Sequence, residues 1–336
     1  MKNVLVVYNP NSGRGNTEKI AGKLATRLTD FGFCAEIFRS ESKECLANYF
    51  EESAKPHPVT ACHPSLEGNC EDQSFPDFSA TKEVAEKEKA LPDCLVIVGG
   101  DGTVSGVMNV MFKTGLDLPL AIFGRGTAND LANYFGTGKS IIKFVKVFVK
   151  SDFLLCDTLL INDWLYALSN AGGGAFTNGV TKYTRKHKKL FGKTAYYTRA
   201  VLDGLRLKSQ SAKITIDGEE INENIFLFLA LNTTNIAGMK GVVKGARIND
   251  GLIHLIVVPK SGFFGKLSLA VDLLLRRLTK NKRAIYKTGK EVKVELSGKV
   301  IHSFSTPDID GDGSAEFPLS VKISGRKVKI LTDRKS

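Results

Sequence analysis

The sequence has no long apolar run. None of its 336 residues lies in a stretch of the roughly 18 uninterrupted apolar residues that a membrane-spanning helix requires. The apolar run at residues 4–8 is too short for the core of a signal peptide. We therefore expect a soluble, cytoplasmic protein. Its length and its 43% of hydrophobic residues favour two domains with a substantial core.

Cysteine is scarce, with six residues in the chain. Without an export signal we expect reduced thiols rather than disulfides. The residues nearest to a zinc-ligand set are Cys45, His57, Cys62, His63 and Cys70. Their spacing fits none of the paired motifs of zinc sites, so we expect no zinc there.

Acidic residues are outnumbered, with 35 Asp and Glu against 47 Lys and Arg, which gives a formal charge of +12. Such a charge attracts polyanions: nucleotides, nucleic acids or anionic lipid head groups. Helix-turn-helix, RNP and zinc-finger patterns are absent, so we expect no nucleic-acid partner. The charge alone does not choose between nucleotides and lipids.

The first 135 residues alternate apolar runs with helical patterns, which is typical of βα units and a parallel sheet. The strands are predicted at residues 4–8, 34–38, 95–98 and 118–123. Helices are predicted to begin near Asn16 or Thr17 and at Thr103, where apolar residues recur at helical spacing. This pattern predicts a Rossmann-like α/β domain over residues 1–135, interrupted by an irregular, proline-containing insertion at 54–80.

Residues 136–336 show short strand patterns separated by turn signals such as Asp217-Gly218 and Ser324-Gly325. They predict a largely antiparallel, β-rich second domain, whose last strand can return to the first domain. The strands are predicted at 153–160, 164–169, 213–216, 225–231, 252–258, 291–296, 300–305 and 319–323. Helices are predicted at 194–207 and 266–278.

Two glycine-bearing loops follow predicted strands. The loop at residues 9–15 (NPNSGRG) directs main-chain N–H groups and a helix N-terminus towards an anion. It has neither the Gly-Lys-Ser/Thr ending of a Walker A loop nor the dinucleotide pattern, and an ordinary turn uses the same residue types. The turn at 99–103 (GGDGT) brings main chain close to phosphate oxygens. Its Asp101 requires a metal ion or a hydroxyl partner, because a carboxylate beside phosphates is repelled.

A third loop, GRGTANDLA at residues 124–132, also follows a predicted strand. Parallel strands present their carboxyl ends at one edge of a sheet, where open α/β folds bind ligands. We therefore expect the three loops to converge on one site, and this convergence is a stronger indication than any one loop.

In this order, the NPNSG, GGDGT and GTANDLA segments resemble the catalytic domain shared by diacylglycerol, ceramide and sphingosine kinases and bacterial lipid kinases. The resemblance continues in the DGL element at residues 250–252 and in Asp310-Gly311-Asp312, where bacterial members usually have Asp-Gly-Glu. It covers nearly the whole chain outside the insertion. It implies a Rossmann-like domain followed by a β-rich domain, and an ATP-dependent lipid kinase with diacylglycerol as the leading acceptor.

The resemblance also implies residue roles. ATP would contact Asn9, Pro10, Asn11, Ser12, Gly13, Ser40, Gly99, Gly100, Asp101, Gly102, Thr103, Val104, Ser105 and Thr127. Asp312 would be the general base, with Asp101 as the second catalytic carboxylate. A structural Mg²⁺ would take the Asp250 carboxylate and main-chain carbonyls of Arg247 and Leu252, since hard cations prefer oxygen ligands.

The chemistry points in the same direction. A lipid hydroxyl is a poor nucleophile, so phosphoryl transfer requires positioned phosphates, Mg²⁺ and a carboxylate that takes the proton. A turn at Asp310-Gly311-Asp312-Gly313 also has a surface-turn or a Ca²⁺-loop interpretation, although a calcium loop needs a further Glu and flanking helices.

The sequence departs from the family pattern at several positions. Residues 232–239 stand where relatives have a run of glycines, and residues 244–246 stand where they have a proline before the DGL element. Asp312 is one methylene shorter than the usual glutamate. Arg125 replaces an apolar residue and offers a phosphate contact. These changes leave the substrate open.

Two basic stretches accompany apolar residues. The first contains Lys182, Arg185, Lys186, Lys188 and Lys189, and the second contains Arg276, Arg277, Lys280, Lys282 and Arg283. They predict docking on an anionic membrane surface, and a solvated helix face is the alternative. We thus expect peripheral membrane association, and the sequence is compatible with a homodimer.

Two other functions fit parts of the pattern. NAD kinases share the GGDGT turn and a related two-domain plan, although residues 126–132 favour a lipid kinase. A lipid- or nucleotide-binding protein that has lost catalysis would explain the altered glycine run and Asp312.

Overall fold

The computed structural model describes residues 2–12, 16–54, 91–138, 140–150, 152–174, 208–236, 238–311 and 315–333. Several sequence predictions lie outside these residues: nearly all of the insertion at 54–80, the helix at 194–207, the basic stretch at 182–189, and the site residues Gly13 and Asp312.

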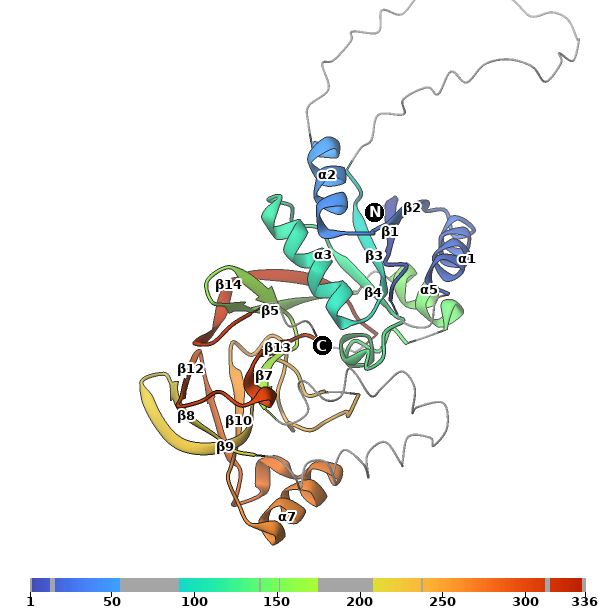
Figure 1. The fold of residues 1–336 in the computed structure, drawn as a ribbon. Helices are drawn as coiled ribbons and strands as arrows, with labels where there is room; N and C mark the ends of the chain where they lie inside the picture. Colours follow the sequence, from blue (N-terminus) through green and yellow to red (C-terminus); the bar gives the residue numbers. More distant parts are fainter. Residues whose placement is uncertain are drawn as a thin grey trace, which may run out of the picture.

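The N-terminal part is a parallel sheet with helices on both faces (Figure 1). Its strands are β1 (Asn3–Tyr8), β2 (Cys34–Arg39), β3 (Cys94–Gly99) and β4 (Leu120–Gly124), in the order β4-β3-β1-β2. Its helices are α1 (Thr17–Thr29), α2 (Lys43–Ala54), α3 (Asp101–Lys113), α4 (Asp130–Tyr134) and α5 (Ile141–Lys150). The continuous apolar runs of β1, β3 and β4 are explained by this double covering.

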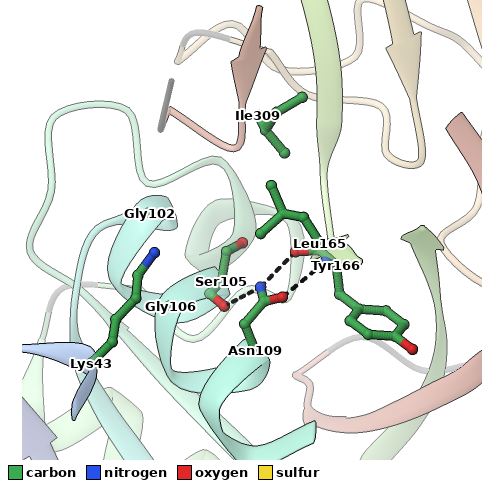
Figure 2. A pocket seen from close by; sticks show the side chains of 8 residues that line it. All are labelled: Lys43, Gly102, Ser105, Gly106, Asn109, Leu165, Tyr166 and Ile309. Atoms are coloured by element: carbon green, nitrogen blue, oxygen red, sulfur yellow. Dashed lines mark hydrogen bonds between the residues drawn. The ribbon is translucent and has the colours of Figure 1, made fainter. Parts of the chain in front are cut away.

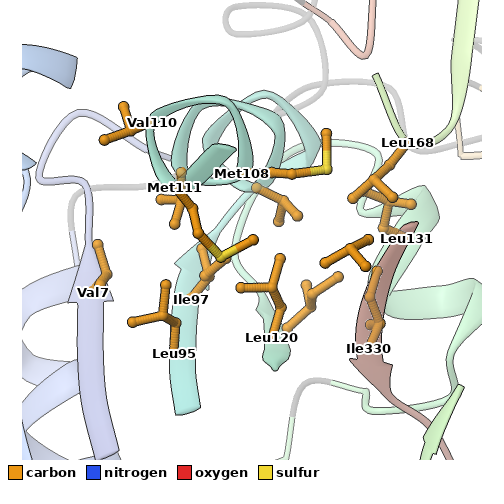
Figure 3. Close-up of a cluster of buried hydrophobic side chains, with 14 of the residues drawn as sticks. Val7, Leu95, Ile97, Met108, Val110, Met111, Leu120, Leu131, Leu168 and Ile330 are labelled. Atoms are coloured by element: carbon orange, nitrogen blue, oxygen red, sulfur yellow. The ribbon is translucent and has the colours of Figure 1, made fainter. Parts of the chain in front are cut away.

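The two faces of β1 belong to different hydrophobic cores, because successive side chains of a strand point to opposite faces. Leu5 and Val7 pack with residues of α2, α3 and α4 in one core (Figure 3). Val4 and Val6 pack with residues of α1 and α5 in the other. Helix α5, which the sequence analysis did not identify, thus covers the N-terminal sheet although it lies beyond residue 135.

The C-terminal part is rich in antiparallel strands, so the predicted fold class is confirmed. Its strands are β5 (Phe153–Ile161), β6 (Leu165–Ala167), β7 (Asn170–Gly174), β8 (Gln210–Ile216), β9 (Glu219–Leu231), β10 (Ile253–Pro259), β11 (Ile285–Gly289), β12 (Glu291–Ser297), β13 (Asp308–Ile309) and β14 (Leu319–Leu331). Helix α7 (Phe263–Leu274) lies far from the N-terminal sheet (Figure 1).

Strand β14 connects the two parts. It pairs antiparallel with β12 and β5, and Ile330 pairs in parallel with Leu120 of β4. The described strands therefore form one hydrogen-bonded network rather than two separate sheets.

Three local predictions need correction. The strand predicted at 300–305 is a short 3₁₀ helix, His302–Phe304, which buries Phe304 in the hydrophobic core of the C-terminal part. The helix predicted to begin at Thr103 begins two residues earlier, at Asp101, with Gly100 as its N-cap. The helix predicted at 266–278 runs from Phe263 to Leu274, and Arg276 with its φ of 56° stands just beyond its end.

Candidate nucleotide and acceptor site

The three glycine-bearing loops contact one another at the carboxyl edge of the parallel sheet, as the sequence predicts. The hydroxyl groups of Ser12 and Thr103 lie 2.7 Å apart and share a hydrogen bond between the first and second loops. The Arg125 N–H donates to the carbonyl of Gly99 at 2.7 Å, which connects the third loop to the second. Residues distant in the sequence thus form a single surface at this edge.

Two glycines make the contact between the second and third loops sterically possible. A Cβ atom on Gly126 would lie 2.4 Å from the Cα of Gly100, and one on Gly100 would lie 2.9 Å from the Cα of Gly126. Both are closer than real Cβ atoms approach main chain. The sequence analysis assigned the glycines to close approach of phosphates, and the structure adds that they let the two loops pack directly.

Asn129 closes the third loop. Its main chain is left-handed, with φ 53°, and its side chain is buried. The Oδ1 atom accepts the N–H of Gly126 at 2.6 Å, and Nδ2 donates to the Gly126 carbonyl at 2.8 Å. Asparagine tolerates this conformation better than most residues, which is the signal in GTAND that could have identified its role.

Asp101 lies in the first turn of α3 and holds the start of α4. Its Oδ2 accepts the N–H of Asp130 at 3.1 Å, and its Oδ1 accepts the N–H of Leu131 at 3.0 Å. Burial raises the pKa of Asp101, and the negative charge of Asp310 raises it further. The main-chain N–H of Asp101 itself is a third donor to this carboxylate, so about one of its four acceptor positions remains for a hydroxyl or a cation.

Asp310 is the main site residue that the sequence analysis did not single out. It is 2% exposed and accepts four hydrogen bonds. Oδ2 accepts the Ser105 hydroxyl and the N–H of Leu168, the latter at 2.7 Å. Oδ1 accepts the N–H groups of Ser169 and Asn170 at 2.8 and 2.9 Å. Burial raises the pKa of this carboxyl despite these donors.

These contacts attach the end of β13 to helix α3. Ser105 belongs to the N-terminal part, whereas Asp310 and its main-chain donors belong to the C-terminal part. A Cβ on Gly102 would lie in ordinary contact, 3.7 Å, with the Asp310 carbonyl oxygen. Asp312, the predicted base, lies outside the described residues, but Gly311 next to it lies within them.

The other predicted nucleotide contacts occupy varied positions. Ser40 follows β2, its N–H donating to the Tyr8 carbonyl at 2.9 Å, and Thr127 is exposed in the third loop. The side chain of Val104 is fully buried in the core beneath α3, because it lies on the sheet-facing side of the helix. Only its main chain remains available to a nucleotide. Arg125, proposed for phosphate, places its guanidinium 4.9 Å from the Phe123 ring centre.

A pocket lies between the two parts, beside the first turns of α3 (Figure 2). It is lined by Lys43, Gly102, Ser105, Gly106, Asn109, Leu165, Tyr166 and Ile309. Asn109 holds one wall in place: its Nδ2 donates to the Tyr166 carbonyl at 2.7 Å, and its Oδ1 accepts the Tyr166 N–H at 2.8 Å. These two hydrogen bonds hold β6 against α3 at one wall of the pocket.

The loop predicted to hold Mg²⁺ is closed by hydrogen bonds of its own. Asp250 accepts the N–H of Arg247 at 2.9 Å and that of Leu252 at 3.0 Å, and the Arg247 carbonyl accepts the Asp250 N–H. His254 Nε2 lies 3.0 Å from Asp250 Oδ2, and its Nδ1 lies 2.7 Å from the Tyr286 hydroxyl. This pairing fits an Nε2–H imidazole that donates to the carboxylate and accepts from Tyr286.

In this loop the Asp250 carboxylate and the Arg247 carbonyl each accept main-chain N–H groups. The described residues also contain no cluster of three or more His, Cys, Asp and Glu side chains suited to a metal ion. The Mg²⁺ assignment at Arg247, Asp250 and Leu252 thus remains a prediction from the family resemblance.

Helix α7 carries an exposed apolar stripe. Phe263, Leu267, Val271 and Leu275 recur every four residues and face outward, and the adjacent Phe264 is 82% exposed. The exposed basic residues Arg276, Arg277, Lys280, Lys282 and Arg283 follow the helix. No helix among the described residues is long and apolar enough to cross a membrane.

Comparison with known proteins finds that the chain is similar to diacylglycerol kinases. Residues 3–161 match the diacylglycerol kinase catalytic domain. The chain is 26% identical to a diacylglycerol kinase of Bacillus subtilis over 301 residues, covering 89% of this chain and 88% of the relative. It is 28% identical to a diacylglycerol kinase of Staphylococcus saprophyticus, with 98% and 95% covered.

A solved structure of a diacylglycerol kinase from Bacillus anthracis has a similar fold. The TM-score is 0.68 at 19% identity, and the similarity covers 99% of this chain and 97% of the other. The same arrangement of an N-terminal parallel sheet and a strand-rich C-terminal part is therefore found in a protein of very different sequence.

Proposed function

We propose that this chain, whose residues 3–161 match the catalytic domain of diacylglycerol kinases, is an ATP-dependent lipid kinase. It transfers the terminal phosphoryl group of ATP to a lipid hydroxyl, with diacylglycerol as the leading acceptor and phosphatidate as the product. The similarity to this family supports a lipid kinase in general, and the choice of diacylglycerol as the acceptor is our proposal.

One observation carries the proposal: Asp310 connects the end of β13 to Ser105, in the helix that follows the GGDGT turn. The same carboxylate accepts the N–H groups of Leu168, Ser169 and Asn170. Residue 310 is thereby held beside the helix that follows the turn proposed for phosphate. A nucleotide-binding turn alone would not need this connection, whereas phosphoryl transfer needs a base near the phosphates.

In the proposed reaction, Asp312 accepts the proton of the lipid hydroxyl as its oxygen attacks the terminal phosphorus. A P–O bond forms to the lipid, and the bond from that phosphorus to the bridging oxygen breaks, with ADP as the leaving group. Asn9 to Gly13, Ser40, Gly99 to Ser105 and Thr127 would hold ATP. Mg²⁺ bound with ATP would reduce the negative charge of the phosphates, and Asp101 retains an acceptor position suited to it.

Asp310 acts in this proposal as a positioning residue. Its carboxylate is enclosed by four donors, so it is poorly placed to accept the proton itself. The attachment of residue 310, two positions before the proposed base, would help to position that base. A shorter carboxylate than the usual glutamate then depends on the main chain being held close to the acceptor.

The acceptor would be reached at a membrane surface. The outward stripe on α7 contains two adjacent aromatic rings, Phe263 and Phe264, and five exposed cations follow it. Apolar side chains flanked by Lys and Arg bind the interface of anionic bilayers, where each cation contributes about 1 kcal/mol. A peripheral association through α7 is therefore consistent with a lipid substrate.

A phosphorylation assay with labelled ATP tests the proposal. Purified protein is given diacylglycerol, ceramide, sphingosine and NAD in parallel, the lipids in vesicles that contain phosphatidylglycerol. We expect phosphorylation of a lipid, with diacylglycerol preferred. Phosphorylation of NAD alone would replace the proposal with a NAD kinase. No turnover with any acceptor, despite ATP binding, would indicate a binding protein.

Asp312→Asn should lower kcat by about 100- to 10,000-fold, because it removes the group that takes the proton. ATP affinity, measured by calorimetry, should remain unchanged. Asp312→Glu keeps a carboxylate and should retain more activity than the amide, and Asp117→Asn on the exposed surface is the matched control. Unchanged turnover in Asp312→Asn would remove this residue from the mechanism.

A further inference from the structure

Lys43 lines the pocket between the two parts. It belongs to α2 and lies outside the three glycine-bearing loops. It is the first residue of α2, and its side chain is exposed to solvent. Among the eight residues that line the pocket it is the one basic side chain. Figure 2 shows its ammonium on the side of the pocket where Gly102 and Ser105 lie.

Gly106 provides the surface on which the lysine stem rests. The Cε of Lys43 lies 3.7 Å from the position that a Cβ on Gly106 would occupy. Gly106 lies inside α3, where glycine is less favourable than alanine. A methyl group would just fit there, whereas a larger side chain would collide with the lysine stem.

The remaining walls place this pocket beside the loops proposed for ATP. Gly102 and Ser105 belong to the predicted ATP contacts. Ile309 immediately precedes Asp310, and Leu165 and Tyr166 come from β6. The pocket thus has a polar side formed by α3 and Lys43 and an apolar side formed by the C-terminal part.

We propose that Lys43 binds the phosphoryl group that is transferred, first as the terminal phosphate of ATP and then as the phosphate of the lipid product. The inference rests on the proposed kinase function. A transferred phosphoryl group spreads negative charge over its outer oxygens, and a lysine ammonium offers three donors to such oxygens.

Lys113 at the other end of α3 supplies a matched control. Both lysines lie near Glu44, whose pKa is lowered first by hydrogen bonds from its own main chain and from Ser42, and less by the charges of Lys43 and Lys113. Lys113 is exposed and does not line the pocket. Each of the two variants therefore removes one cation near Glu44, but only one of them affects the pocket.

The test compares Lys43→Met with Lys113→Met in the lipid-kinase assay and in nucleotide binding. We expect Lys43→Met to lower kcat/KM for ATP by about 10- to 100-fold, the range of a hydrogen bond to a charged group. Lys113→Met should remain within about twofold of the wild type. Lys43→Arg should recover part of the loss, because it restores the charge.

Measurements of nucleotide binding distinguish a direct contact between Lys43 and the transferred group from a structural role of Lys43. In Lys43→Met, affinity for a non-hydrolysable ATP analogue should fall while affinity for ADP stays the same, since ADP lacks the terminal phosphate. Gly106→Leu, which displaces the lysine stem without removing it, should repeat this pattern, and Gly106→Ala should not.

Equal losses for ADP and the analogue, or an active Lys43→Met enzyme, would overturn the assignment of Lys43. A wild-type protein that phosphorylates no lipid would instead overturn the proposed function. The two failures are therefore distinguishable.

Discussion

The loop edge of the sheet and helix α7 are built in opposite ways. At the loop edge, carboxylates are enclosed by main-chain donors and glycines bring main chain into contact, as Asp310 and the Gly100–Gly126 pair show. On α7, aromatic and basic side chains stand in solvent, with Phe264 the most exposed. Phosphoryl transfer demands fixed geometry, whereas binding to a fluid bilayer demands only charge and apolar area.

This contrast predicts that changes at the loop edge alter both stability and activity with any acceptor. Changes on α7 should alter activity only when the acceptor is presented in a membrane. The pair of responses is a stronger test than either alone, because general damage to the protein would affect both assays.

The largest effect is expected for Asp310→Asn. An amide placed in this site turns one NH₂ group towards donors, so either Leu168 or the Ser169 and Asn170 pair loses its acceptor. Each buried group left unsatisfied costs about 1–3 kcal/mol of unfolding free energy, measured by urea denaturation. We expect activity to fall by at least about 100-fold with both soluble short-chain and vesicle-bound acceptors, because the proposed base would lose the positioning that Asp310 supplies.

The control is Asp163→Asn, which changes an exposed carboxylate paired with Lys322 and should alter the free energy of unfolding by less than about 0.5 kcal/mol.

The pH dependence of stability provides a second check of Asp310. Burial raises the pKa of Asp310, so the folded state binds its proton more tightly than the unfolded state. This contribution is present at low pH and is lost as pH rises through the raised pKa, and Asp310→Asn should abolish it. A wild-type and variant pair with parallel stability curves would contradict the assignment.

An intermediate effect is expected for Gly126→Ala. The new methyl group would lie 2.4 Å from the Gly100 Cα, so main chain must move, at a cost of about 1–3 kcal/mol in unfolding free energy. Nucleotide affinity should fall with it. Gly22→Ala in α1 has no atom within 4 Å of its Cβ and should instead stabilise the protein by up to about 1 kcal/mol. Equal responses of the two variants would show that the loops do not pack as described.

The smallest effect on stability is expected for Lys280→Gln combined with Lys282→Gln beyond α7. Loss of two cations should weaken binding to phosphatidylglycerol vesicles by about 2 kcal/mol, or roughly 30-fold, in a sedimentation assay. The melting temperature and the activity on a soluble short-chain acceptor should not change. Lys19→Gln combined with Lys23→Gln on α1, at the other end of the molecule (Figure 1), is the control. Equal vesicle binding by both double variants would remove α7 as the docking surface.

The sequence predicted the elements whose signal is local. The apolar runs of β1, β3 and β4 show buried parallel strands, and a glycine-bearing loop follows each of them. Parallel strands necessarily present these ends at one edge, so the convergence of Ser12, Thr103 and Arg125 could be predicted without coordinates.

Contacts between distant segments could not be predicted in this way. The sequence around Asp310 indicates only a turn, and its hydrogen-bond partner Ser105 lies in a different part of the chain. Val104 next to Ser105 belongs to the core, because neighbouring residues of a helix face different directions. The pairing of His254 with Asp250 likewise depends on how β10 follows its loop, and no spacing rule indicates it.

The position of β14 bears on how the chain folds while it is being synthesised. Ile330 packs in the core beneath α3, and Leu331 packs in the core on the opposite face of the same sheet. β4 is translated long before these residues, so Leu120 can pair with Ile330 only after the C-terminal strands before β14 have been translated. The N-terminal sheet is thus completed only after the strands of the C-terminal part have been made, although its own strands are translated first.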